Sequence, residues 1–312
     1  MNQMRKPDTS DQQAGTHAAT ELSGAEVVTH ESARESINEF SHEFSHDSTH
    51  DSTRESQPFA PPTANSNATA SDATLAARLA QFDRSAQRRQ YLEQGEFLFI
   101  EDFLPTSLQQ MLIDGVSATR AQLNRNFIPG HKKGGSVSRH TIDREAPAIA
   151  ALYRDPAFIA WLESLCGERL QLSPESDPHA YALYFYTEAG DHIGWHYDTS
   201  YYAGRRYTVL LGVIDRSSAK LAYRLHTRNP ERVPVEGEVA LAPGALVLFN
   251  GDTLHHRITP LGAGEERVAL TFEYVTDPYM KPWHRLFSNL KDAFAYFGLR
   301  QVFRRGGARS PR

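Results

Sequence analysis

The chain has 312 residues, 40% of them hydrophobic, and a formal net charge of −5 at pH 7, a size that suits one large domain or two small ones. Its single cysteine, Cys166, excludes an intrachain disulfide and favours a cytoplasmic location. We expect neither a membrane-spanning helix, which needs ~18 consecutive apolar residues, nor a signal peptide, which needs an apolar core near the N-terminus.

Residues 1–72 differ from the rest of the chain in composition. They carry 12 acidic and 4 basic side chains, a net charge of −8, and almost no apolar clusters. Because so few apolar groups cannot offset the entropy lost on ordering, we predict a disordered acidic tail rich in Ser and His. His42, His46 and His50 recur every four residues, and we interpret them as polar low complexity rather than a metal site.

The segment 73–180 is predicted to be mostly helical. Apolar residues at helical spacing and flanking caps or prolines indicate helices at 74–91 and 107–120 and a helical pair at about 146–169. A strand is expected at 95–100 and a Gly-rich basic loop at 129–135.

From residue 180 the pattern changes to short β-like runs separated by turn residues. Residues 266–275 alternate between a polar face with Arg267 and Glu273 and an apolar face, whereas 206–214 is apolar on both faces and should be a central strand. We predict a mainly β fold with supporting α-helices: a double-stranded β-helix (jelly roll) packed by the N-terminal helices. The eight expected strands are 180–187, 194–199, 206–214, 220–226, 237–241, 245–250, 254–259 and 266–275.

Residues 281–312 carry eight basic side chains and one acidic side chain, a net charge of +7. Apolar residues at helical spacing predict a basic amphipathic C-terminal helix and tail. Packing of this helix on the domain is favoured; the alternative is that residues 284–305 lie on an anionic membrane or grip a partner.

The residues His196, Asp198 and a His at 255 or 256 form the most informative pattern. His196 and Asp198 are two apart, so on a strand their side chains point to the same face. A His from a distant strand then completes two imidazoles and one carboxylate, the ligand set of non-haem Fe(II) oxygenases. Arg267 follows at a spacing that suits a dicarboxylate co-substrate, since a guanidinium binds a carboxylate bidentately.

With these residues in place, the stretch from about 180 to 275 resembles the catalytic jelly roll of the Fe(II)/2-oxoglutarate-dependent oxygenases, in particular their prolyl-4-hydroxylase-like branch. The matching elements, about a third of the chain, are Gly190, His196-Tyr-Asp198, Arg206-Tyr-Thr-Val-Leu-Leu, Pro243-Gly-Ala-Leu-Val-Leu-Phe, His256-Arg-Ile-Thr-Pro and Arg267. The resemblance implies an oxygenase domain over 73–280 that uses Fe(II), 2-oxoglutarate and O₂, with ascorbate as a reductant. It departs from many relatives at 217–223, which lacks their Gly-Gly-acidic turn.

The resemblance also implies a role for individual residues. His196, Asp198 and His256 would bind the metal; His255, adjacent on the same strand, would face the other way. Arg267 would bind the distal carboxylate of 2-oxoglutarate, although it lies eleven residues after His256, one more than usual. The alternatives are a salt bridge between Arg267 and Glu265 or Glu266, and Arg257 as the anchor. Either Tyr184 or Tyr186 would hydrogen-bond the co-substrate, or both are core aromatics.

Other residues near the motif have weaker interpretations. His192 is a polar loop residue, and Trp195 and Tyr197 should face away from the site, into the core. Four basic residues could meet an acidic substrate or simply be solvated: Lys132, Lys133, Arg205 and Arg206.

The expected function is hydroxylation of an unactivated C–H bond of a small molecule, such as an amino acid, a lipid-like compound or a biosynthetic intermediate, with release of succinate and CO₂. Halogenating relatives replace the carboxylate ligand by a small residue, whereas Asp198 is present here. Nucleic acid is not expected, because DNA-repair relatives have an arginine where this chain has Glu273. The alternatives are a protein prolyl or aspartyl hydroxylase and a non-catalytic jelly-roll binding protein that docks through its C-terminal helix.

Overall fold

The structure is a computed structural model that describes residues 75–280. The predicted acidic tail at 1–72 and basic helix at 281–312 lie outside the described residues. No helix in the described part is long and apolar enough to cross a membrane.

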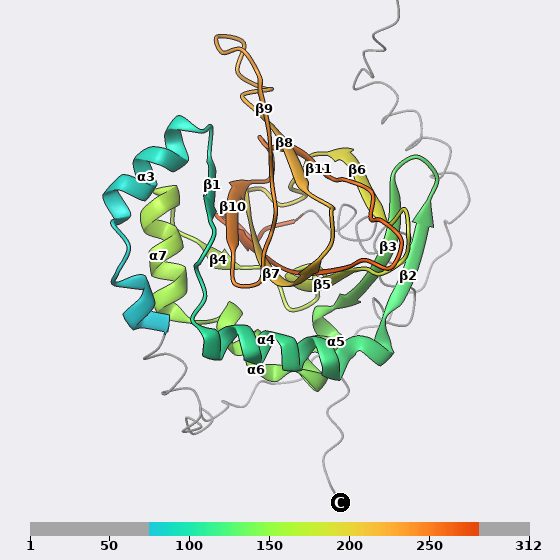
Figure 1. Cartoon of the computed structure of the whole chain (residues 1–312). Helices are drawn as coiled ribbons and strands as arrows, with labels where there is room; N and C mark the ends of the chain where they lie inside the picture. Colours follow the sequence, from blue (N-terminus) through green and yellow to red (C-terminus); the bar gives the residue numbers. More distant parts are fainter. Residues whose placement is uncertain (1–74, 281–312) are drawn as a thin grey trace, which may run out of the picture. The chain divides into compact units, whose positions relative to one another are not determined.

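The described strands form a single antiparallel sheet that curls around a central space (Figure 1). Strand β2 (Asn124–Ile128) pairs with β3, and β4 (Gln171–Leu172) pairs with β12. The mainly β jelly roll with supporting helices is therefore confirmed, and all eight strands expected after residue 180 are present. The strand order is β1 (Phe97–Ile100), β10 (Leu246–Asn250), β7 (Arg206–Arg216), β12 (Glu266–Val275), β5 (Tyr181–Tyr186), β3 (Lys132–Ser138), β6 (His192–His196), β11 (His255–Ile258), β8 (Leu221–Leu225) and β9 (Val235–Val239).

Strand β3 links the two halves of the curled sheet. Its C-terminal part pairs with β5, and Lys132 and Lys133 at its start pair with β6. The prediction of a Gly-rich loop at 129–135 is wrong, because β2 and β3 form a hairpin there. Gly135 is needed for packing and not for a turn: a Cβ at this position would lie 2.4 Å from a Cδ atom of Leu123.

The helices lie outside the sheet, along two of its sides in Figure 1. The predicted helix at 74–91 is interrupted at 80–83, where Asp83 caps a new helix by accepting a hydrogen bond from the Ala86 amide at 2.9 Å. The helical pair expected at 146–169 is confirmed as α6 and α7, and α5 was not predicted. The helices with their bounds are α3 (Arg84–Glu93), α4 (Thr106–Thr119), η1 (Arg120–Gln122), α5 (Arg139–Glu145), α6 (Pro147–Tyr153) and α7 (Pro156–Cys166).

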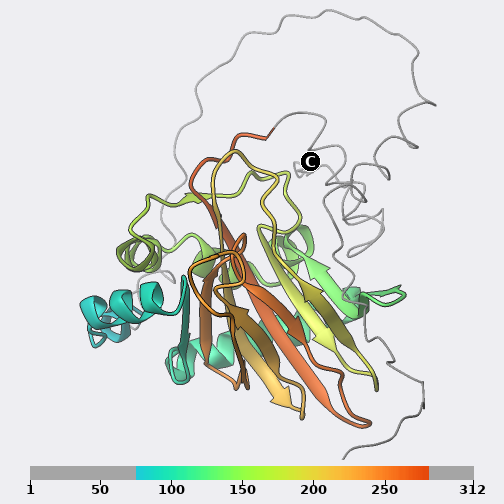
Figure 2. The ribbon, with the colours of Figure 1, turned by 90° about the horizontal axis from the view of Figure 1, so that it is seen from above.

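Aromatic side chains join the helices to the outer face of β12. Trp161 and Phe158 of α7 are fully buried, and the Trp161 ring centre lies 5.1 Å from that of Phe103. Phe158 in turn contacts Phe272 and Tyr274 edge-on. Figure 2 shows the long strands side by side with α3 and α4 outside them. This core holds the strands in place while their other face lines the central space.

Trp161→Ala should lower the free energy of unfolding by about 3–5 kcal/mol, because it removes a large buried ring and leaves a cavity. Denaturant unfolding followed by circular dichroism measures this change. Leu92→Ala, on a residue that is 47% exposed, is the control and should change it far less. Equal losses in the two variants would contradict a core centred on α7.

Candidate metal centre and its pocket

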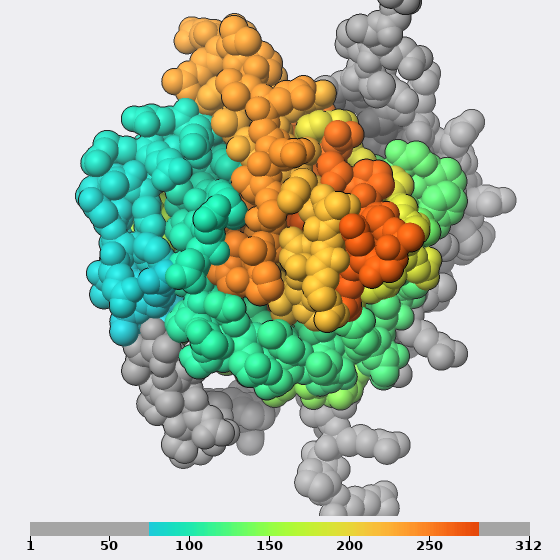
Figure 3. All heavy atoms as spheres, in the orientation of Figure 1, coloured from blue at the N-terminus to red at the C-terminus, as the bar shows by residue number. Residues whose placement is uncertain are grey.

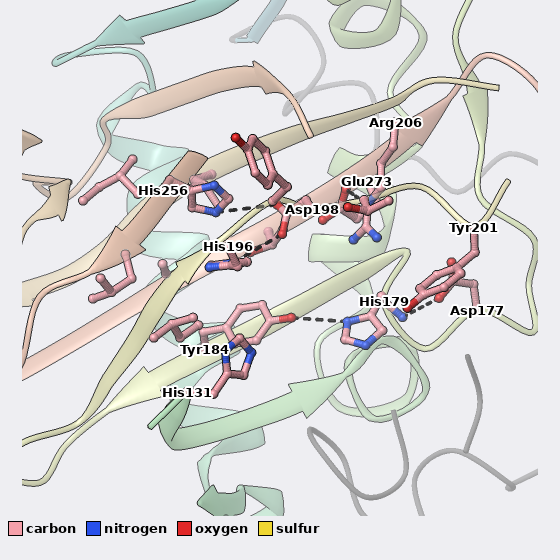
Figure 4. Close-up of a pocket in the computed structure, with 18 of the residues that line it drawn as sticks. His131, Asp177, His179, Tyr184, His196, Asp198, Tyr201, Arg206, His256 and Glu273 are labelled. Carbon is pink, nitrogen blue, oxygen red and sulfur yellow. Dashed lines mark hydrogen bonds and ion pairs between the residues drawn. The ribbon is translucent and has the colours of Figure 1, made fainter. Parts of the chain in front are cut away.

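Three side chains, from β6, from the segment just after it and from β11, converge at one point (Figure 4). His196 ends β6, Asp198 follows two residues later, and His256 of β11 is the direct pairing partner of His196. One ligand atom from each residue lies within 4.8 Å of the others. Asp198 Oδ1 is 3.4 Å from His196 Nε2, and Asp198 Oδ2 is 3.8 Å from His256 Nε2. These three residues form the metal triad.

Backbone carbonyls orient both imidazoles of the metal triad. His196 Nδ1 donates to the Gly194 carbonyl at 2.8 Å, and His256 Nδ1 donates to the Leu254 carbonyl at 3.2 Å. Because a carbonyl oxygen only accepts, the proton must sit on Nδ1, which leaves the Nε2 lone pair facing the triad. Thr208 Oγ1 lies 3.1 Å from Asp198 Oδ2 and orients the carboxylate in the same way.

The electrostatics of the site favour the protonation states that bind metals. Burial and the neighbouring His196 lower the pKa of His256 to about 4, so its ring is neutral at pH 7. Burial favours the neutral form of Asp198, but the attraction of His256, His196 and Arg206 outweighs it and lowers the pKa of this carboxyl. A neutral imidazole and an ionised carboxylate are therefore available to a cation without loss of a proton.

His255 faces the opposite side of β11 from His256. Its ring stacks between Trp195 and Tyr197, with ring centres 5.0 and 4.7 Å away. The prediction that these two aromatics lie in the core, facing away from the site, is wrong: both are only half-buried, and Tyr197 also lines the cavity beside the metal triad. Arginine side chains stack over their rings instead, two of them on Trp195 and one on Tyr197, namely Arg224, Arg257 and Arg228.

A cavity of about 230 Å³ opens beside the metal triad, and Arg267 lines it. This side chain is 1% exposed. Its Nη1 donates to the Ala219 carbonyl at 3.2 Å, while Nε and Nη2 have no hydrogen-bond partner among the described residues. Buried donors without an acceptor are costly, and two adjacent ones on a planar guanidinium match a carboxylate. Two adjacent donors of Arg267 thus lie at the cavity without a partner among the described residues.

The residues that offered alternatives to a co-substrate role for Arg267 have other partners in the structure. Glu266 pairs with Arg120 and Arg216, and Glu265 accepts hydrogen bonds from Ser218 and the Gly262 amide. Neither acidic group is therefore bonded to Arg267. Arg257 stacks on Trp195, on the side of β11 that faces away from the triad.

Tyr184 and Tyr186 both line the cavity. Tyr186 is the pairing partner of Arg267 across β5 and β12, and Tyr184 pairs with Ala269. The Tyr184 hydroxyl lies 3.3 Å from His179 Nδ1, and Lys132 Nζ stands 5.1 Å from the centre of its ring. Both tyrosines are thus near a ligand bound at Arg267.

The remaining basic candidates divide between the cavity and the surface. Arg206 lines the cavity, whereas Arg205 is exposed and pairs with Glu96 and Glu168 at 3.5 Å each. Lys133 donates to the Ala189 carbonyl at 2.8 Å, outside the cavity wall. His192 Nδ1 bonds the Gly190 carbonyl at 2.8 Å.

Several cavity residues were not predicted from the sequence. His131, in the β2–β3 turn, stands edge-on to His196 with ring centres 6.1 Å apart. His179 and Asp177 come from the loop before β5. Their only sequence signal is polarity, which loop residues share in general. Glu273 had a stronger signal, its place on the polar face of 266–275.

Gly251, just after β10, packs against the metal triad. A Cβ added there would lie 2.6 Å from the Asp198 carbonyl oxygen and 2.9 Å from the Asp198 Cβ. The Gly251 amide also donates to the Arg206 carbonyl at 2.8 Å, so the backbone has little room to move away. Gly251→Ala should therefore displace Asp198 and weaken Fe(II) binding about 10- to 100-fold, the usual cost of disturbing a ligand's support.

Anaerobic Fe(II) titration of the purified variant measures this loss. Gly264→Ala is the control: its φ of 75° strains an alanine backbone, but a Cβ there has nothing within 4 Å, so stability should fall while Fe(II) affinity stays at the wild-type value. Unchanged Fe(II) affinity in Gly251→Ala would mean that Asp198 does not need this close contact.

Comparison with known proteins gives matches at the level of sequence family and of fold. Residues 80–204 match the model of a family described as Halogenase D. No curated protein matches the chain.

Solved structures resemble the chain in fold at low identity. The alpha-ketoglutarate-dependent epimerase SnoN of nogalamycin biosynthesis is 14% identical, with a TM-score of 0.52 over 62% of this chain and 82% of that one. The carbocyclase SnoK of the same pathway is also 14% identical, with a TM-score of 0.51 over 63% of this chain and 85% of that one.

A prolyl hydroxylase from Trichoplax adhaerens, solved with a hypoxia inducible factor peptide, is 16% identical, with a TM-score of 0.51 over 69% of this chain and 95% of that one. The resemblance expected from the motif is therefore confirmed: the chain has the fold of the Fe(II)/2-oxoglutarate-dependent oxygenases, prolyl hydroxylases included.

Proposed function

We propose that the protein is an Fe(II)- and 2-oxoglutarate-dependent oxygenase that hydroxylates an unactivated C–H bond of a small molecule. The observation that supports it most is one cavity that holds both the metal triad and the unpartnered donors of Arg267. A borderline cation such as Fe(II) and a dicarboxylate fit these two places, and this class uses Fe(II) with the dicarboxylate 2-oxoglutarate as co-substrate.

Each residue has a binding or orienting role in this proposal. His196, Asp198 and His256 would hold Fe(II), and three protein ligands would leave positions open to the co-substrate and O₂. Arg267 fixes the distal carboxylate of 2-oxoglutarate, and Tyr184 or Tyr186 bonds the same co-substrate. Bound iron supplies the oxidising chemistry, with succinate and CO₂ as co-products; the protein sets the geometry and excludes water.

Hydroxylation is favoured over halogenation by Asp198. The family model that matches residues 80–204 is named for a halogenase, yet a carboxylate stands at the second ligand position. Halogenating relatives leave this position to a halide through a small residue. With Asp198 as ligand, oxygen transfer is the expected outcome.

A protein substrate is the second candidate, because the Trichoplax structure contains a prolyl hydroxylase with a peptide fragment. A cavity of about 230 Å³ walled by Asp177, His179 and Arg206 suits a small polar molecule better than a peptide chain.

Product analysis tests the proposed reaction. Protein loaded with Fe(II), 2-oxoglutarate and ascorbate is incubated with panels of small molecules and, separately, of proline- or aspartate-containing peptides under ¹⁸O₂ and chloride, and products are identified by mass. We expect a product that gains one labelled oxygen. A chlorinated product, or labelled oxygen found only in peptides, would contradict small-molecule hydroxylation.

A further inference from the structure

The cavity is lined by a second arginine, Arg206, which lies far from Arg267. Along the inner face of β12, Arg267 and Glu273 are six residues apart, which is roughly 20 Å of strand. Arg206 of β7 bonds Glu273 and so lies at the far end from Arg267, beyond the metal triad. A five-carbon dicarboxylate held at Arg267 spans less than half that length. Arg206 is therefore out of reach of a 2-oxoglutarate held at Arg267.

Glu273 fixes the direction of the Arg206 side chain. Arg206 Nε donates to Glu273 Oε2 at 2.7 Å, and Thr208 Oγ1 lies 3.0 Å from the same oxygen. The exposed fractions of the two ionic side chains are 17% for Arg206 and 5% for Glu273. A guanidinium held at Nε cannot rotate freely, so its two Nη groups keep one orientation.

Those Nη groups face the cavity. A guanidinium has five N–H donors, and the only hydrogen bond that Arg206 makes to the described residues uses Nε. Figure 4 shows its nitrogens in the space between Asp198 and the side of the cavity formed by Asp177 and Tyr201. The Nη donors are thus not bonded to the described residues and can receive an acceptor from a ligand in the cavity beside the metal triad.

The local charge limits what that ligand can be. The fields of Glu273, Asp198 and Asp177 all act on Arg206, so the surroundings of its positive charge are acidic. These three carboxylates repel any anion, a phosphate dianion about twice as strongly as a carboxylate monoanion, and the planar pair of Nη donors matches a carboxylate.

We propose that Arg206 binds a carboxylate of the primary substrate, and that the enzyme acts on small molecules with a free carboxylate group. This inference rests on the proposed oxygenase function. Because Arg206 stands next to Asp198, a carboxylate bound there holds the carbons near it beside the metal.

The first test compares acids with their amides in the wild-type holoenzyme. Aliphatic, aromatic and α-amino monocarboxylic acids, each beside its primary amide, are added to protein loaded with Fe(II) and 2-oxoglutarate, and succinate formation is followed. We expect one or more acids to raise the rate, with a KM about 10- to 100-fold lower than that of the matching amide, the value of a hydrogen bond to a charged group.

The second test uses two neighbouring arginines. Arg206→Gln should raise the KM of the stimulating acid about 10- to 100-fold and bring it close to that of the amide. Arg205→Gln changes an exposed arginine outside the cavity wall and should leave the acid's KM as in wild type. Arg206→Lys keeps the positive charge without the planar donors, so its KM for the acid should lie between those of Arg206→Gln and wild type.

The outcomes separate this inference from the oxygenase proposal. Wild-type protein that forms no succinate under any condition contradicts the oxygenase function itself. Basal succinate formation that no acid stimulates, equal KM values for acid and amide, or equal KM values in Arg206→Gln and Arg205→Gln would overturn the carboxylate subsite and leave the oxygenase standing.

Discussion

His256→Ala should weaken Fe(II) binding by more than about 100-fold, whereas His255→Ala, one residue earlier, should leave it near wild type. The first change removes one of three metal ligands, a larger loss than the 10- to 100-fold cost of altering a ligand's support. The second removes a ring that stacks between Trp195 and Tyr197 on the other side of β11. Anaerobic calorimetric titration with Fe(II) measures both affinities.

The pair of variants is a matched comparison, because both remove an imidazole from the same strand. His255→Ala loses aromatic contacts worth about 0.5–1.5 kcal/mol, so thermal unfolding should show a modest loss of stability without a loss of metal. Fe(II) binding that survives in His256→Ala and disappears in His255→Ala would place the third ligand one residue earlier.

Arg267→Ala should raise the KM for 2-oxoglutarate by at least about 30-fold. Truncating one partner of a buried, hydrogen-bonded charge pair costs about 2–5 kcal/mol, and the Arg267 side chain is almost fully buried. Its unpartnered Nε and Nη2 have the spacing of a bidentate carboxylate contact. Succinate formation at varied 2-oxoglutarate concentration gives the KM.

Arg257→Ala is the control for this prediction. Arg257 lies on β11 outside the cavity, stacked on Trp195 with its guanidinium carbon 4.8 Å from the ring centre. We expect its KM for 2-oxoglutarate to match wild type. A large increase in the KM for 2-oxoglutarate in Arg257→Ala, with no increase in Arg267→Ala, would show that Arg257 and not Arg267 binds the co-substrate.

Much of the β-rich C-terminal part of the described chain was predictable because strands have a period of two. The alternation of 266–275 separates Arg267 and Glu273 from the apolar side chains that meet α7, as the structure shows. The same period separates His256, which lines the cavity, from His255, which stacks on Trp195. Arg206, the first residue of β7, lines the cavity, whereas Arg205, just before the strand, is exposed.

The wrong structural predictions concern residue types that are common in two different structural settings. Glycines at 134 and 135 suggested a loop, but they allow β3 to pass close to neighbouring side chains. Asp83 looked like part of one long helix and instead caps a second. Trp195 and Tyr197 looked like core residues, whereas arginine side chains cover them.

The cavity wall was predicted least well. His131, Asp177 and His179 come from a turn and a loop, where the side-chain direction depends on contacts distant in sequence. A surface feature was also not predicted. In Figure 3 the segment between β8 and β9, which includes Val233 at 83% exposure, protrudes from the body of the molecule. Its protrusion follows from strand pairing and not from its own composition.

The most direct measurement is succinate formation from 2-oxoglutarate by protein supplied with Fe(II) and ascorbate, in wild type and in Asp198→Ala. We predict that wild type forms succinate even without a primary substrate and that Asp198→Ala falls to the rate of protein-free buffer, because it loses the only carboxylate of the metal triad. A wild-type protein that neither forms succinate nor binds 2-oxoglutarate would contradict an oxygenase.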